Sequence, residues 1–214
     1  MESAAIPAAG AAHEPEHEHH GPPEANRSSR VEPQFLGMLL FIISEIMLFL
    51  AFFTAYFFIR VVLDAPWPAE GEKLPIETGI ANSFILFSSS GTMHWALESA
   101  RRGNRLGLKL GLLTTFLLGT TFLAVQINEY VFLSFAPADN AQGTIFYGLT
   151  GLHGTHVLVG LLLLAFATVR AFRGHYSPDE HRGVEVPGIY WHFVDVMWIF
   201  VFGSLYLLSS QGLL

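Results

Sequence analysis

The stretch from residue 35 to residue 63 constrains the fold most, because it is a long apolar run that holds one carboxylate, Glu45. A membrane-spanning helix needs about 20 apolar residues, and an ionisable group near its middle costs at least about 3 kcal/mol unless it is paired or protonated. In a helix that begins near Phe35, Glu45 lies about 15 Å along the axis, near the centre of a hydrocarbon core about 30 Å thick. We therefore expect Glu45 to face protein. It is either a protonated acid that hydrogen-bonds a neighbouring helix, or part of a proton route or a polar anchor for a lipid or a partner.

Four further segments complete a predicted set of five transmembrane helices, over residues 35–63, 76–97, 106–130, 145–172 and 189–208. Hydrophobic residues make up 51% of the chain, and the 14% that are charged gather between the apolar runs, as is typical of polytopic membrane proteins. We therefore predict an all-α fold, a membrane helical bundle over residues 33–214. The segment 76–97 is the least hydrophobic, but its Asn82, serines, threonines and glycines suit close helix packing and hydrogen bonds across an interface.

Residues 1–32 are rich in alanine, proline, glutamate and histidine, so we expect a disordered polar tail and no signal peptide. Four histidines in it form either a transition-metal site or a solvated low-complexity stretch: His13, His17, His19 and His20. Much of the net charge of −7 lies in this tail, and nothing in the charge pattern points to a nucleic-acid partner. The absence of cysteine excludes disulfides, thiolate zinc sites and iron–sulfur clusters.

Lysine and arginine are distributed unevenly between the two ends of the predicted helices. Nine of the eleven lie in the tail or around the second-to-third and fourth-to-fifth connections, and only Arg60 and Lys73 lie at the opposite ends. Cytoplasmic segments carry an excess of these residues. We therefore expect a cytoplasmic N-terminus and, after five spans, a C-terminus outside.

The predicted spans contain more ionisable and imidazole side chains than lipid-facing helices tolerate: Glu45, His94, Glu98, Glu129, His153, His156, His192 and Asp195. A di-metal carboxylate bundle would need Glu-x-x-His pairs, which the sequence lacks. A haem would need two histidines at similar depth on facing helices. The sequence leaves a haem site open, with His153 or His156 opposite His94 or His192. A transporter is disfavoured because the five spans show no paired repeats. The remaining reading is a subunit whose polar groups bind a neighbour, a lipid headgroup or a proton pathway.

The sequence contains four motifs in a characteristic order: FIISEIMLFLAFFTAYF, NEY, GLHGTHVLVG and YWHFVDVMWIFVFGSLY. Together they resemble subunit III of the haem–copper terminal oxidases, the cytochrome c oxidase family, over about residues 35–210. The resemblance implies a helical membrane subunit that packs against the catalytic subunit I, in a complex with subunit II and a small subunit IV. It implies no catalytic residue, haem, copper or other metal in this chain. Haem and copper belong to the partner subunits, and structural phospholipid is expected.

The resemblance also assigns roles to residues of this sequence. Glu45 matches the acid of the family's SE motif, a buried carboxylate associated with proton handling and carbodiimide reactivity. The other positions expected to lie in the membrane near protons or lipid are Glu129, His153, His156, His192 and Asp195. Those expected near lipid headgroups or the cytoplasmic surface are Arg170, His181 and Glu185.

The function that the resemblance implies is that of a non-catalytic subunit of a proton-pumping oxidase in the bacterial plasma (inner) membrane. In aerobic electron transport it would keep proton uptake fast and hold lipids. The chain lacks the two helices that precede the SE motif in the longer form, so it resembles the five-span bacterial form. The electron donor stays open: the motifs favour cytochrome c, whereas the tail is similar to that of ubiquinol oxidase subunit III, and an accessory subunit in nitric-oxide reduction is a third placement. From the residues alone, a membrane redox protein with its own haem or metal remains the alternative.

Overall fold

The computed structural model describes residues 33–63, 68, 74–177 and 181–208, and every regular element in these ranges is a helix. The helices are α2 (Pro33–Phe57), α3 (Ile76–Arg101), α4 (Arg105–Phe132), α5 (Ala141–Phe172) and α6 (Arg182–Phe202). Two π-helical turns continue α2 and α6: η1 (Phe58–Val62) and η2 (Gly203–Leu207). The predicted all-α fold is confirmed. The predicted polar tail, residues 1–32, lies outside the described residues.

Four stretches of the described chain are long and apolar enough to cross a membrane: Phe35–Val62, Arg105–Phe132, Ala141–Phe172 and Arg182–Leu207. The remaining helix, α3, has 26 residues and is therefore also long enough to span the membrane, but it is more polar than the other four. Asn82, Ser83 and Ser89 of α3 are buried inside the bundle. A helix of this kind needs protein around it, and its crossing of the membrane stays a prediction.

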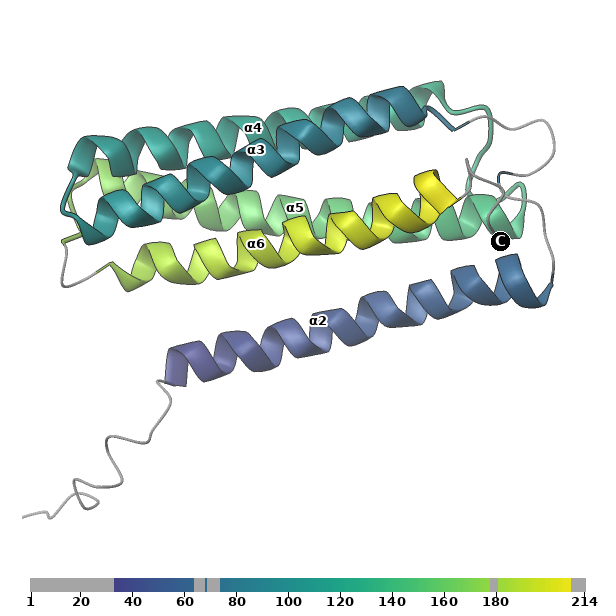
Figure 1. The fold of residues 1–214 in the computed structure, drawn as a ribbon, viewed down its shortest axis with the longest axis horizontal. Coiled ribbons are helices and arrows are strands. Elements are labelled where there is room, and N and C mark those ends of the chain that lie inside the picture. Colours follow the sequence, from purple (N-terminus) through teal and green to yellow (C-terminus); the bar gives the residue numbers. More distant parts are fainter. Residues whose placement is uncertain (1–32, 64–67, 69–73, 178–180, 209–214) are drawn as a thin grey trace, which may run out of the picture. The chain divides into compact units, whose positions relative to one another are not determined.

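Helices α3 to α6 form a bundle (Figure 1). Small residues inside it let aromatic side chains lie close to neighbouring backbones. The indole of Trp191 on α6 is fully buried and packs against Gly119 of α4 and Gly160 of α5. A Cβ atom added at Gly160 would lie 2.8 Å from this indole. Trp191 also donates a hydrogen bond from Nε1 to Ser89 Oγ at 2.9 Å, which ties α6 to α3. The glycines of this bundle therefore set the helix spacing.

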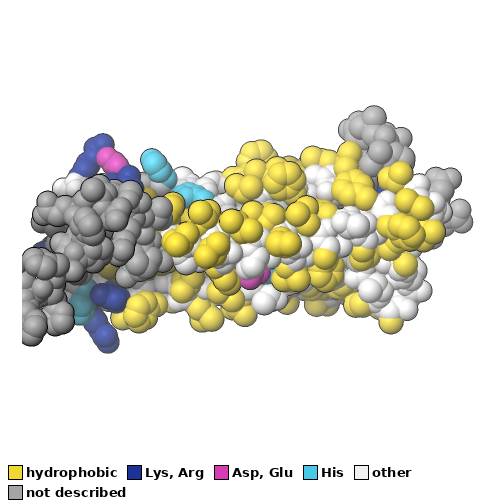
Figure 2. All heavy atoms as spheres, turned by 90° about the horizontal axis from the view of Figure 1, so that it is seen from below, with side chains coloured by type: hydrophobic (Ala, Val, Ile, Leu, Met, Phe, Trp, Pro, Cys, Tyr) yellow, Lys and Arg dark blue, Asp and Glu magenta, His cyan; other side chains and the backbone are white. Residues whose placement is uncertain are grey.

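Helix α2 packs beside α5 and α6 along one narrow face, which is formed by residues four and three apart: Met38, Ile42, Glu45, Phe49, Phe52 and Tyr56. Phe49 and Tyr56 are fully buried, and the Tyr56 hydroxyl donates to the Ser204 carbonyl at 2.6 Å. The rest of α2 exposes large apolar side chains, as a lipid-facing helix does. Figure 2 shows hydrophobic side chains over the middle of one face and Lys and Arg side chains gathered at one end.

The prediction that the last helix begins near residue 189 is wrong, because α6 begins at Arg182 and contains Pro187. Proline has no N–H to bond the carbonyl four residues earlier, which is that of Gly183. The Tyr176 hydroxyl, from the loop after α5, donates to this carbonyl at 3.2 Å. A side chain from outside the helix therefore satisfies the group that Pro187 leaves free, and no sequence-based rule for proline anticipates that.

Candidate functional site

The carboxylate of Glu45 on α2 lies against the imidazole of His156 on α5, with Oε2 and Nε2 2.8 Å apart. The other ring nitrogen, Nδ1, lies 2.8 Å from the Leu152 carbonyl, which can only accept, so Nδ1 carries a proton and donates it. Nε2 is then either protonated beside an ionised Glu45, or a bare acceptor for a protonated one. The pair therefore shares one proton between two side chains from different helices.

Aromatic rings enclose the Glu45–His156 pair. The Phe49 ring lies 5.0 Å from the His156 ring, and the Phe193 ring lies 6.3 Å from it. Tyr190 donates a hydrogen bond to the backbone carbonyl of His156 at 3.3 Å. Such an apolar wall strengthens the interaction of the pair, because the local dielectric constant is low.

The two histidines of the GLHGTHVLVG motif lie in different surroundings. His153 is fully buried between the Phe122 ring of α4, 5.8 Å away, and the Trp198 ring of α6, 4.9 Å away. Neither of its ring nitrogens has a hydrogen-bond partner among the described residues. The structure thus brings only His156 to Glu45.

Glu129 forms a second, separate polar centre near the C-terminal end of α4. Its Oε1 accepts a hydrogen bond of 2.6 Å from Tyr206, whereas its Oε2 is buried without a partner among the described groups. Tyr130 donates to Thr150 at 2.8 Å on the same level. A pocket of about 230 Å³ opens beside this carboxylate, lined by Leu74, Pro75, Thr78, Asn128, Glu129, Phe132 and Leu133.

A third polar centre joins α6 to α3. Ser90 on α3 donates its hydroxyl hydrogen to Oδ2 of Asp195, and its Oγ lies 2.9 Å from Nδ1 of His192. The hydroxyl oxygen of Ser90 therefore bridges the carboxyl group of Asp195 and Nδ1 of His192. The histidine therefore does not lie between the acid and the hydroxyl, as it does in a hydrolytic triad. The sequence indicated His192 and Asp195, and it placed Ser90 among the residues that suit packing and hydrogen bonds across an interface without naming its partners.

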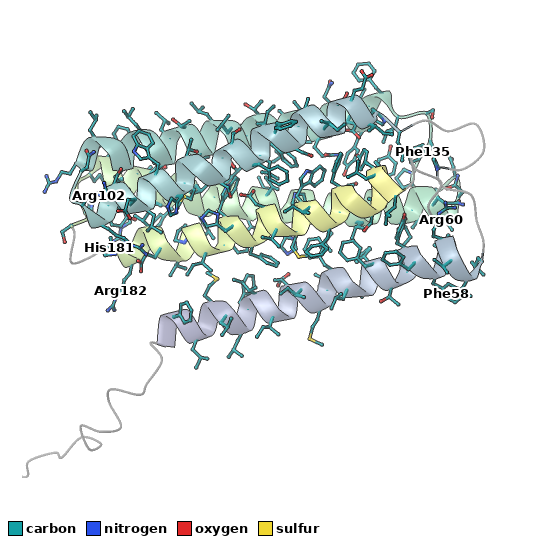
Figure 3. All side chains as sticks on the ribbon, in the orientation of Figure 1. Phe58, Arg60, Arg102, Phe135, His181 and Arg182 are labelled. Atoms are coloured by element: carbon teal, nitrogen blue, oxygen red, sulfur yellow. The ribbon has the colours of Figure 1, made fainter. Side chains whose placement is uncertain are left out.

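The residues expected near lipid headgroups divide into two groups at the end of the bundle that Figure 3 marks with Arg102, His181 and Arg182. Glu185 accepts from Arg101 at 3.0 Å and lies 3.2 Å from Nε2 of His181, so it joins the end of α3 to the start of α6. Arg170 is exposed and lies over the Phe166 and Tyr176 rings at 5.8 and 5.6 Å. Of the three expected residues, Arg170 is therefore the one that the bundle presents as a cation.

Sequence reasoning missed the tyrosine and tryptophan donors that complete these centres. Tyr206, Tyr190 and Trp191 come from the stretch YWHFVDVMWIFVFGSLY, which the sequence marked for its histidine and aspartate. Their spacing alone does not distinguish a hydrogen-bonding tyrosine from an interfacial one. Among the described residues, no group of three or more His, Asp or Glu side chains is placed to hold a metal ion.

Comparison with known proteins identifies the family. The family model described as cytochrome c oxidase subunit III matches residues 26–210, a range that contains all five helices. The chain belongs to the cytochrome c oxidase subunit III family. It is 41% identical over 194 residues to cytochrome c oxidase subunit 3 of Synechocystis sp., and the aligned residues make up 90% of this chain and 79% of that relative. It is 40% identical over 176 residues to cytochrome c oxidase subunit 3 of Gallus gallus, which covers 79% of this chain and 67% of that relative.

The chain is a membrane protein and a component of a terminal oxidase complex, as its family is. The resemblance drawn from the four motifs is confirmed. The predicted roles of individual residues stay predictions.

Proposed function

We propose that this chain is the non-catalytic subunit III of a proton-pumping terminal oxidase of the cytochrome c oxidase type. It packs on the catalytic subunit I, in a complex that also holds subunit II and a small subunit IV, and supports proton uptake there. The observation that carries the proposal is the contact between Glu45 and His156 at 2.8 Å, on helices that are otherwise apolar enough to face lipid. An ionisable residue within a membrane span is by default a candidate functional site.

The Glu45–His156 pair supports a role with protons because it holds one proton that either side chain can carry. The side chains are 19% and 9% exposed, respectively, so the pair is shielded but not sealed from its surroundings. A change of charge nearby in subunit I would shift the shared proton from one atom to the other without moving a helix. The pair is thus a proton-holding positioning element, and oxygen chemistry takes place on the haem and copper of the partners.

Arg170 supports the proposed lipid-holding role. Its guanidinium is exposed at the end of α5, and rings on two sides fix its position. A guanidinium binds phosphate with paired hydrogen bonds. Arg101, Arg102 and Arg105 lie at the α3–α4 connection, at the same end of the bundle as Arg170, and such basic residues mark the membrane interface. The expected ligand of Arg170 is therefore the phosphate of a membrane lipid.

The orientation follows from the same arginines. The α3–α4 and α5–α6 connections lie at the end of the bundle that carries the basic residues, and they would therefore face the cytoplasm of a bacterial cell. The N-terminus then lies on the cytoplasmic side and the C-terminus outside. In this orientation Glu129 and its pocket lie near the outer surface.

The test uses the whole complex, purified through a tag on this chain. We expect haem- and copper-containing subunits to co-purify, and Glu45→Gln to slow proton uptake during turnover while the haem spectrum stays unchanged. The matched control is Glu77→Gln, which changes an exposed acid in the first turn of α3. Absence of haem-containing partners, or equal proton uptake in both variants and the unaltered complex, would contradict the proposal.

A further inference from the structure

We propose that the α3–α6 bundle binds a file of water molecules, which connects the buried imidazole of His153 with the pocket beside Glu129. The pocket lies where α4 ends, at the end of the bundle that Figure 3 marks with Phe135. Through this water file, Glu129 and His153 exchange protons with the aqueous phase at that end. The inference goes beyond the proposed function, because it concerns side chains inside the bundle and not the Glu45–His156 pair. Three observations support it.

The first observation is a concentration of buried polar atoms that have no hydrogen-bond partner among the described residues. Of six such side-chain atoms, five belong to Asn82, Gln126, Glu129 and His153, and the sixth belongs to Asp195 in the centre between α6 and α3. The four side chains that share the five atoms are at most 5% exposed. Buried polar groups are nearly always hydrogen-bonded, to protein or to ordered water. Water can donate and accept, so it fits the unpaired carboxylate and amide oxygens as well as the amide nitrogen.

The second observation is that these four side chains follow one line through the bundle. On α4, Gln126 and Glu129 follow Phe122 at steps of four and three residues, so the three share one face and span about 10 Å of the helix axis. Asn82 of α3 donates to the Phe122 carbonyl at 3.1 Å, and the His153 ring of α5 lies 5.8 Å from the Phe122 ring. The line therefore starts with Asn82 and His153 at the level of Phe122 and ends at Glu129.

Hydroxyl groups accompany this line between its two ends. Gln126 lies next to the hydroxyls of Tyr130 and Tyr206. Tyr130 donates a hydrogen bond to Thr150 at 2.8 Å. Thr150 lies on α5 three residues before His153, so it is on the same side of that helix. Bound water thus has polar neighbours at each level, and chains of acid and imidazole side chains inside membrane proteins are a common form of proton relay.

The third observation is that the line meets a pocket at one end. Glu129 lines the pocket of about 230 Å³ together with Thr78 and Asn128, which add polar groups to its wall. A pocket of this volume has room for several water molecules. The carboxylate therefore lies between the aqueous phase on one side and the buried polar line on the other.

The opposite end of the line is closed. Beyond His153 the buried polar side chains bond within the chain: Ser89 accepts from Trp191 at 2.9 Å, and Thr115 donates to the carbonyl four residues earlier at 2.8 Å. Val157, which follows His153 on the same side of α5, is fully buried and apolar. The water file is therefore a well that opens to one side, and it is not a channel across the bundle.

The test introduces single cysteines, since the chain has none. Thr150→Cys places a thiol on the line, and the control Val157→Cys places one beyond its closed end, at positions that are both fully buried on α5. The probe is the silver ion, which bonds to thiolates and, as a charged species, enters only where water or polar groups replace its hydration. In the purified oxidase, the thiol that silver leaves unblocked is measured with a maleimide after unfolding. We expect position 150 to be blocked about tenfold faster than position 157, or more. Equal rates, fast or slow, would overturn the water file.

A plug in the line gives a further check. Gln126→Leu, combined with Thr150→Cys, replaces the buried amide by an apolar group of similar size. It should slow the reaction of silver with position 150, whereas the control Ile127→Leu, which changes an exposed neighbour on α4, should leave the rate unchanged. An unaltered rate with Gln126→Leu would contradict a water file that passes Gln126.

A third measurement needs no variant. A high-resolution electron cryo-microscopy map of the unaltered complex should show ordered water within hydrogen-bonding distance of the His153 imidazole and of Glu129 Oε2. A map in which protein or lipid atoms contact both groups directly would overturn the proposal. None of these results depends on whether the Glu45–His156 pair handles protons, so the proposed function stands or falls separately.

Discussion

Replacement of Glu45 by alanine tests how α2 is held on the bundle. The change removes the 2.8 Å contact with His156 and leaves one imidazole nitrogen without its partner. A hydrogen bond that involves a charged group contributes about 1.5–3 kcal/mol to stability, whereas interhelical hydrogen bonds inside membranes average about 0.6 kcal/mol. Because the aromatic surroundings lower the local dielectric constant, we place this pair within the higher range. We expect Glu45→Ala to lower the free energy of unfolding by about 2 kcal/mol.

The assay is thermal unfolding of the complex, followed through a cysteine that becomes reactive when α2 detaches. Phe53, which is 9% exposed on the packed face of α2, is a suitable reporter position because the chain has no other cysteine. A loss of about 2 kcal/mol corresponds to a midpoint lower by about 4–8 °C for a chain of this size. The haem spectrum of the whole complex should not change, and retention of lipid or of this subunit should fall.

A double-mutant cycle decides whether the pair itself is responsible. Glu45→Ala and His156→Ala should each destabilise α2, and the double variant should cost less than the sum of the two, because the second change removes a contact that is already lost. Costs that simply add would refute the reasoning. So would loss of haem from a Glu45→Ala complex that retains its normal subunit stoichiometry.

Three further predictions concern other parts of the chain. Gly160→Ala places a Cβ 2.8 Å from the Trp191 indole and should destabilise the bundle by about 1–3 kcal/mol, measured by thermal unfolding. Tyr206→Phe removes the 2.6 Å hydrogen bond to Glu129 and should cost about 1 kcal/mol in the same assay without loss of proton uptake. Arg170→Ala should reduce the phospholipid that co-purifies with the complex, measured by mass spectrometry of extracted lipid, because it removes the exposed guanidinium at the end of α5.

Each of these three changes has a control within the chain. Gly37→Ala fills open space within a helix, so it should not lower the unfolding midpoint. Tyr147→Phe removes a partly exposed donor to the Phe135 carbonyl, and its cost should be smaller than that of Tyr206→Phe. Arg173→Ala removes an exposed cation close to the end of α5, and lipid retention equal to that of Arg170→Ala would show that net charge, rather than Arg170, holds the lipid.

The sequence predicted the helices well because length and hydrophobicity decide them. Residues 35–62 of the predicted span 35–63 are helical, and the weakly hydrophobic segment 76–97 is part of a helix that reaches Arg101. The depth of Glu45 in an apolar helix was enough to predict that it faces protein. The cost of a buried carboxylate leaves few alternatives, so this kind of inference needs no knowledge of the partner residue.

The sequence did not predict which side chains contact one another. A step of three residues puts His153 and His156 on neighbouring parts of α5, but the rotation of α5 against α2 determines which one meets Glu45. The start of α6 was missed because Pro187 normally ends a helix, and Tyr176 compensates for it through a contact that only the folded chain creates. Ser90 was expected to hydrogen-bond across a helix interface, but its partners were not, since serine is common where helices pack closely.

The absorption spectrum of this chain after its separation from the purified complex tests the central claim most directly. The account holds that the intramembrane polar groups bind one another and a protein partner, and that prosthetic groups belong to the partner subunits. Soret absorption should therefore remain entirely with the partner fraction, and the isolated chain should show only the ultraviolet absorption of its aromatic residues. Haem absorption that follows this chain would contradict the account.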